Sequence, residues 1–272
     1  MEKFLASIDR RYIYIVLVLV ILYPLFSPIG LPISISTWTE SFYAEIDKLQ
    51  AGDIVVMSID YSPSGGPDVG PQAVAVFDHL MAKNVKVIGV SFLAEGPPQL
   101  QQILNPYMEG RGKTYGVDFV NLGYSAGLET AIAAFCADMK RAFPVDFFNT
   151  PTNTIPLMQE VTDANDVAIV MNYATGIPGP AEWVRQLAGF SPDILIGVVT
   201  VMGPQTEPYY QSGQIKGLLS GLRSAAEYEV RAGMPGSAAA GMDAQSLGHV
   251  VIILAMALGN LAYFLGRKGG AK

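Results

Sequence analysis

The segment Gly-Tyr-Ser-Ala-Gly at residues 123–127 has the spacing most typical of a known chemistry. It matches G-x-S-x-G, in which a serine on a tight turn between a strand and a helix is the nucleophile of a hydrolase. Ser125 would need a neighbouring base. The chain has two histidines, His79 in a predicted helix and His249 at the edge of an apolar segment, and Lys216 is the alternative base of a serine–lysine dyad. A glycine turn without catalysis is the other interpretation.

Glycines and small polar residues follow several predicted strands. Ligands of open parallel sheets bind in the crevice outside the carboxyl ends of the strands. The segment Ser-Pro-Ser-Gly-Gly-Pro at 62–67 could hold a phosphate or carboxylate on backbone amides at a helix N-terminus, or form an ordinary turn. It has neither the lysine of a P-loop nor the G-x-G-x-x-G pattern. The predicted ligand-binding residues are Asp60, Ser64, Gly65, Gly66, Ser125, Asn172 and Thr175.

Metal and cysteine chemistry have little support in the sequence. One cysteine and two histidines leave no cluster of the kind that binds zinc or an iron–sulfur centre. Cys136 lies in an apolar helical stretch, which favours a buried, unreactive thiol. We predict no cofactor and no metal.

Two apolar segments lie near the ends of the chain. No charged residue occurs between Arg11 and Glu40, and residues 247–265 carry no formal charge when His249 is neutral. About 20 apolar residues in a helix span a bilayer, so we predict transmembrane helices at 12–35 and 247–266. A cleaved signal sequence and a buried core helix are the respective alternatives.

The basic residues predict an orientation. Three of them precede the first apolar segment, within 1–11, and three follow the second, within 267–272. The positive-inside rule therefore places both termini in the cytoplasm and the main domain outside it. Residues 32–247 contain 11 of the 17 basic and 22 of the 24 acidic residues, a net charge of −11. Such an acidic domain makes a nucleic-acid partner improbable.

Apolar strand-like runs alternate with helical segments between the two anchors. Runs that are apolar throughout indicate strands covered by helices on both faces of a sheet. We therefore predict an α/β domain at 36–232, a parallel five-stranded Rossmann-like three-layer structure. Residues 233–246 have the composition of a linker. The expected strands cover residues 54–59, 85–92, 115–122, 167–172 and 194–201, and the last expected helix covers 214–231.

Small residues recur on one face of the second apolar segment. Such residues let membrane helices approach closely, and Asn260 beside them can add a hydrogen bond between helices. This face predicts packing against the first span or another subunit, in a homo- or hetero-oligomer surrounded by membrane lipids. Its members are Gly248, Ala255, Gly259, Ala262 and Gly266.

Three segments resemble a group of prokaryotic membrane-anchored proteins that have an extracytoplasmic α/β domain and no known activity. They are residues 122–135, 180–187 and 209–229. The resemblance covers most of the predicted outer domain and implies no functional residue.

The function expected from these observations is that of a structural or assembly subunit of a membrane protein complex, not of an enzyme. Its acidic extracytoplasmic domain would bind other proteins. Two alternatives remain open at this point. One is an extracytoplasmic domain that senses or binds a small ligand, and the other is a membrane-anchored serine hydrolase that uses Ser125.

Overall fold

The computed structural model describes residues 10–27 and 29–269 of the chain. The chain divides into two compact units. One unit is the continuous segment Ile33–Met234, and the other combines the segments Met1–Pro32 and Pro235–Lys272.

The unit Ile33–Met234 is built on one parallel sheet with the strand order β3-β2-β1-β4-β5-β6. The order runs outward in both directions from β1, so the sheet has a switch point between β1 and β4. The α/β class and the parallel sheet are thereby confirmed. The strands are β1 (Ile54–Asp60), β2 (Lys86–Ser91), β3 (Phe119–Tyr124), β4 (Ile169–Ala174), β5 (Asp193–Val198) and β6 (Gly217–Ser220).

The predicted number of five strands is wrong, because β6 lies within the segment expected to be the last helix. Its four residues, Gly-Leu-Leu-Ser, are too short for a periodicity of two to stand out from the helical pattern that follows. The helix starts only at Gly221, whose φ of +70° ends the strand. The strand pairs in parallel with β5 from Gly217 to Ser220.

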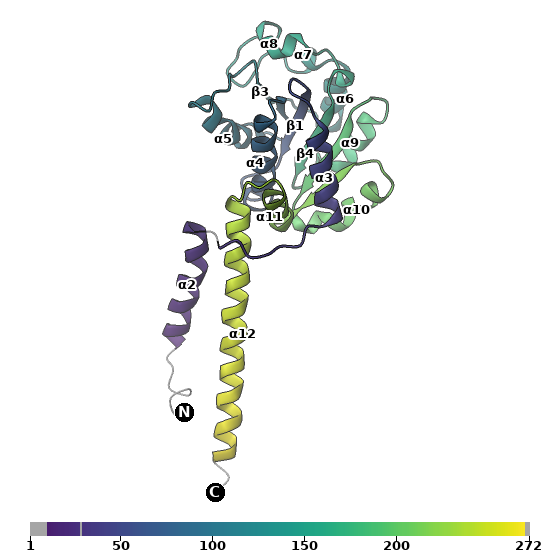
Figure 1. The fold of residues 1–272 in the computed structure, drawn as a ribbon. Helices are drawn as coiled ribbons and strands as arrows, with labels where there is room; N and C mark the ends of the chain where they lie inside the picture. The colour runs from purple at the N-terminus through teal and green to yellow at the C-terminus, as the bar shows by residue number, and fades with distance from the viewer. Residues whose placement is uncertain (1–9, 28, 270–272) are drawn as a thin grey trace. The chain divides into compact units, whose positions relative to one another are not determined.

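Helices cover both faces of the sheet, which gives three layers (Figure 1). The buried cluster on one face includes side chains of α3, α4, α5 and α11, and that on the other face includes side chains of α6, α7, α8 and α9. The helices of this unit are α3 (Thr37–Lys48), α4 (Gly66–Ala82), α5 (Gly96–Met108), α6 (Glu129–Ala137), α7 (Met139–Ala142), α8 (Pro156–Gln159), α9 (Pro180–Leu187), α10 (Gly203–Gln211) and α11 (Gly221–Arg231).

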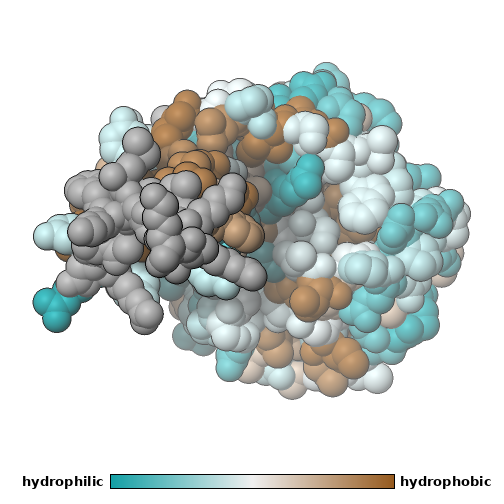
Figure 2. Space-filling view, turned by 90° about the horizontal axis from the view of Figure 1, so that it is seen from below, coloured by the Kyte–Doolittle hydropathy of each residue, from teal (hydrophilic) through white to brown (hydrophobic). Residues whose placement is uncertain are grey.

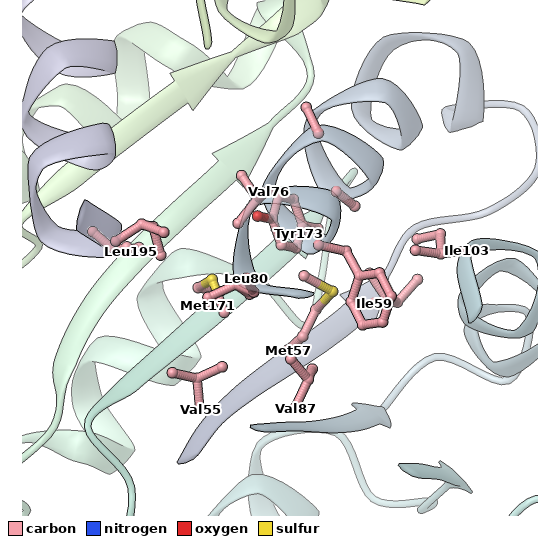
Figure 3. Packing of buried hydrophobic residues seen from close by; sticks show 14 of the residues in the cluster. Val55, Met57, Ile59, Val76, Leu80, Val87, Ile103, Met171, Tyr173 and Leu195 are labelled. Carbon is pink, nitrogen blue, oxygen red and sulfur yellow. The ribbon is translucent and has the colours of Figure 1, made fainter. Parts of the chain in front are cut away.

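Successive residues of each strand point to opposite faces of the sheet and so belong alternately to the two buried clusters. Val55, Met57 and Ile59 of β1 face the layer that contains α4, where they pack near Val76 and Leu80 (Figure 3). Each fully buried aliphatic side chain of this kind stabilises the fold by about 1.5–3 kcal/mol relative to exposure. The intervening positions of β1 face the other layer, and this period of two carries Asp60 to that side.

The second unit contains two helices, α2 (Arg10–Phe26) and α12 (Ser237–Gly269). Among the described residues, one helical segment, Ser237–Leu261, is long and apolar enough by length and composition to cross a membrane. Helix α2 is apolar but has 17 residues, which at about 1.5 Å per residue falls short of a ~30 Å hydrocarbon core. The prediction of two flanking membrane helices is therefore supported only for the C-terminal one.

The first predicted span, 12–35, is longer than the helix because prolines interrupt it. Pro24 lies inside α2, and the sequence after Phe26 contains prolines at 28 and 32, which cannot donate helical hydrogen bonds. The predicted linker 233–246 is instead helical from Ser237 onward, since its alanines favour a helix.

Asp243 joins the two segments of this unit. Its carboxylate is 2 % exposed and accepts hydrogen bonds from the backbone N–H groups of Ile29, Gly30 and Leu31 at 2.8, 2.9 and 3.0 Å. One carboxylate thereby satisfies three consecutive backbone donors. Most of the large side chains of α2 and of α12 beyond His249 are exposed. Figure 2 shows apolar residues in brown at the surface, beside polar residues in teal.

Gly217 permits the close approach of α3 to β6. A Cβ atom at this position would lie 2.4 Å from Cα of Phe42. We expect Gly217→Ala to lower the free energy of unfolding by about 1–3 kcal/mol, because the backbone of α3 has to move away. Thermal unfolding of the full chain checks this. The control, Gly189→Ala, adds its methyl group where no atom lies within 4 Å and should stay near wild type. Equal loss of stability in both variants would contradict the packing described.

Candidate functional site

Asp60 lies at the carboxyl end of β1, beside the switch point of the sheet, and is 1 % exposed. Oδ1 accepts a hydrogen bond from the backbone N–H of Phe92 at 2.7 Å and a long one from Ser91 Oγ at 3.4 Å. Oδ2 accepts from Ser58 Oγ at 2.5 Å and from Asn172 Nδ2 at 2.8 Å. The carboxylate is thus enclosed by donors of its own chain.

Trp183 lies against this carboxylate and offers it a further hydrogen-bond donor. Its Nε1 lies 3.5 Å from Asp60 Oδ2, and its ring is fully buried. Burial raises the pKa of Asp60 to about 6, and the hydrogen bonds from Ser58, Phe92, Trp183 and Ser91 oppose that rise. A carboxyl group with this pKa is typical of a site that moves protons, but its burial leaves no route for a substrate to contact it.

The predicted site residues fall into separate places. Asp60 and Asn172 meet in the buried network. Gly65 meets Thr175, since a Cβ atom on Gly65 would lie 2.2 Å from the methyl carbon of Thr175. The loops after β1 and β4 therefore close on each other across the switch point, where other open α/β sheets hold a ligand. Ser64 is exposed, and its hydroxyl shares a hydrogen bond of 2.8 Å with Ser62.

The N-terminus of α4 has no free amide for an anion over its first positions. The backbone N–H groups of Gly65, Gly66, Asp68 and Val69 all donate to carbonyl oxygens of the same loop, and Pro67 has no N–H. The carboxylate of Asp68 also occupies this first turn, where it accepts from the backbone N–H of Thr200 and of Leu222, both at 2.8 Å. The phosphate or carboxylate interpretation of this glycine-rich segment therefore has no support in the geometry.

Ser125 lies at the far side of the sheet, after β3. Its backbone N–H donates to the carbonyl oxygen of Ser91, but its hydroxyl has no hydrogen bond among the described residues. Helix α6 begins only at Glu129, so the serine is not on the sharp strand-to-helix turn that a nucleophile elbow requires. His79 cannot serve as its base, because its ring lies in the opposite layer, where Nδ1 is 2.8 Å from the hydroxyl of Tyr228.

A hollow of about 480 Å³ opens beside Thr175. The loop after β4 forms one wall, with Ile177 and Glu182, and the segment around Met202 and Tyr209 forms the other. Glu182 is engaged in its own loop, since it accepts from Gly179 N at 2.9 Å and pairs with Arg185 at 2.9 Å. The hollow therefore lacks a free charged group at its wall and is bounded largely by apolar and small polar side chains.

Exposed apolar side chains follow three of the strands at this same carboxyl edge. Ile177 after β4 is 72 % exposed and Val201 after β5 is 85 % exposed. Tyr124 at the end of β3 and Phe147, which lines a hollow together with it, are also exposed. We call these four residues the apolar rim. They were not predicted from the sequence, although large apolar residues in loops rich in glycine and proline were the signal that could have revealed them.

The predicted packing positions of the C-terminal helix lie at different distances from α2. A Cβ atom on Gly248 would lie 3.6 Å from Ile21, so the helices are in contact there. Ala255 and Gly259 line an apolar hollow of about 350 Å³ together with Tyr12 and Val16 of α2. Two further predicted positions, Ala262 and Gly266, lie outside the residues whose surroundings the structure describes.

No family model, no curated protein and no solved structure matches the chain. The resemblance to prokaryotic membrane-anchored proteins remains an expectation.

The raised pKa of Asp60 predicts a specific dependence of stability on pH. Its ordinary value is 3.8, so the folded state holds the proton more firmly than the unfolded state between about pH 4 and 6. This contribution to the free energy of unfolding is fully present below pH 3.8 and is lost as the pH rises through about 6. Relative to Asp60→Asn, which does not titrate, wild type should lose about 2 kcal/mol of stability between pH 4 and pH 7.

Urea unfolding of the two proteins across this pH range measures the difference. Glu95→Gln is the control, because Glu95 is an exposed carboxyl at the same edge and the substitution leaves the buried network around Asp60 intact. A difference between wild type and Asp60→Asn that does not vary with pH would contradict the burial of an ionisable Asp60.

Proposed function

We propose that this chain is a membrane-anchored subunit of a protein complex, and that its α/β domain binds a partner protein through the apolar rim. The observation that carries the proposal is the exposure of Ile177 and Val201, 72 % and 85 %, on neighbouring loops of one sheet edge. Large apolar side chains that meet the solvent together are typical of surfaces that associate. Their position after β4 and β5 places them on an edge supported by a rigid sheet.

The closed crevice supports the same function. A small molecule at the switch point would have to displace the contact between Gly65 and Thr175. It would also meet a carboxylate, that of Asp60, whose hydrogen-bond donors all come from the chain itself. A partner protein needs no such opening, because it covers the edge from outside.

The partner's chemistry follows from the charge of the domain. Residues 32–247 carry a net charge of −11, and complementary potentials favour association with a basic surface. We therefore expect the partner to offer apolar side chains surrounded by lysine and arginine.

The membrane anchor in this proposal is the helix Ser237–Leu261, and an outer domain with cytoplasmic termini also requires the apolar segment that contains α2 to cross the membrane. The clustering of basic residues within 1–11 and 267–272 supports cytoplasmic termini and an extracytoplasmic domain. The contact of Gly248 with Ile21 supports a role of this face in close helix packing, and the hollow at Ala255 and Gly259 leaves room for another helix of the assembly.

A double substitution of the rim tests the interface. We expect Ile177→Asp with Val201→Asp to weaken the complex about a hundredfold, because two carboxylates would be buried against the partner. The fold should be unaffected, since both side chains are exposed. The native mass of the full chain, solubilised gently from its own membranes, should exceed the 29.1 kDa of one chain in wild type and fall toward it in the variant.

Val117→Asp is the matched control. Val117 is 43 % exposed and precedes β3, so it lies at the opposite edge of the sheet. It should leave the native mass unchanged. A wild-type mass of a single chain, or an equal effect of all three substitutions, would refute the proposal.

The orientation is tested separately by cysteine labelling. In a Cys136→Ser background, Ser64→Cys places the one thiol on an exposed loop of the domain. We expect a membrane-impermeant maleimide to label it on intact cells. Ser7→Cys, in the basic N-terminal segment, should be labelled only after permeabilisation. The reverse pattern would show that the domain is cytoplasmic.

A further inference from the structure

We infer that the groove between α4 and α5 binds a small, neutral, hydroxyl-rich molecule of about the size of a monosaccharide, which the hydroxyl of Tyr61 and the amides of Gln99 and Gln102 would hold. This inference goes beyond the proposed function, because the groove lies apart from the apolar rim and its occupant is a small molecule. It also differs from the crevice expected at the switch point, which is closed.

Tyr61 forms the floor of this groove. Its side chain is 2 % exposed, and its hydroxyl has no hydrogen-bond partner among the described residues. The hydroxyl faces the hollow, because Tyr61 is one of the residues that line it, and it can therefore bind a ligand there. Burial raises the pKa of this phenol well above its ordinary value, which keeps it protonated and able to donate.

Two glycines of α4 give access to this hydroxyl. Gly66 and Gly70 are four residues apart and therefore share a face of the helix. A Cβ atom on Gly70 would lie 3.6 Å from the Tyr61 hydroxyl, and one on Gly66 would lie 3.8 Å from Gln99 Oε1. The hollow left between the helices has a volume of about 320 Å³.

The lining excludes a charged ligand. Its residues are Tyr61, Pro63, Gly66, Pro67, Gly70, Val74, Gln99, Gln102 and Ile103, none of which is charged. The amides at the start of α4 are used within their own loop, so they do not attract an anion. A charged ligand would lose its hydration in this groove without an opposite charge to compensate, so the groove favours a neutral molecule.

The polar groups favour hydroxyls over an aromatic base. Both glutamine side chains are free of hydrogen bonds to described residues, and each amide offers a donor and an acceptor. A hydroxyl can likewise donate and accept, so a polyol can use all three side chains. The ring of Tyr61 is buried in the core and presents no face on which a nucleobase could stack.

Ligand-observed NMR on the full chain tests the site. The protein is placed in lipid nanodiscs, so that no sugar-headed detergent competes, and saturation transfer is measured to D-glucose and to myo-inositol. We expect transfer to at least one of the two from wild type. Tyr61→Phe should weaken binding about fivefold, the value of one hydrogen bond, and Gly70→Val should abolish it by filling the groove.

Tyr173→Phe is the matched control for Tyr61→Phe. Tyr173 has a buried hydroxyl without a partner in the described structure and does not line the groove. Its removal should leave binding unchanged. The inference is overturned if neither probe receives saturation from wild type, or if Tyr61→Phe and Gly70→Val bind as wild type does while remaining folded.

Discussion

The carboxylate of Asp60 is the constraint on which the carboxyl edge of this domain depends. It stands at the end of β1 and draws donors from β1 itself, from β2 and its following residue, from β4 and from α9. Burial makes the ionised form of this group costly, and the hydrogen bonds from the chain offset only part of that cost, so its pKa stays raised. The network therefore ties neighbouring strands together at the point where the strand order reverses.

This closure decides what the edge can do. In many open α/β sheets the switch point is left open for a ligand, and function resides inside the crevice. Here the crevice between β1 and β4 is filled by the molecule's own atoms, and the solvent meets the apolar side chains of the loops around it and the hollow beside Thr175. We therefore propose that the outer surface of the edge recognises another protein, and that a separate groove between α4 and α5 binds a small neutral molecule.

Much of the fold followed from the sequence, because period and composition act over several residues at a time. The parallel α/β sheet was predictable from apolar runs between helices, but β6 was not, since four residues carry too little periodic signal. The sequence predicted that the candidate site residues lie close together, and this holds for some of them. Asp60 and Asn172 form a hydrogen bond, whereas Ser125 lies apart from them. The donors Ser58 and Trp183 depend on how strands and helices pack, and no local pattern shows that. The two membrane crossings were predicted from the lengths of the segments that carry no charge. That criterion takes no account of the prolines in and after α2, which keep the helix short.

In the proposed complex the loops after β4 and β5 contact another protein. The most direct test places a photo-crosslinking amino acid, benzoylphenylalanine, at Ile177 of the full chain in its native membrane, and at Val117 in a second sample. We expect a discrete crosslinked product of higher mass from position 177 and none from position 117. Absence of a product at position 177, or equal products at both positions, would contradict it.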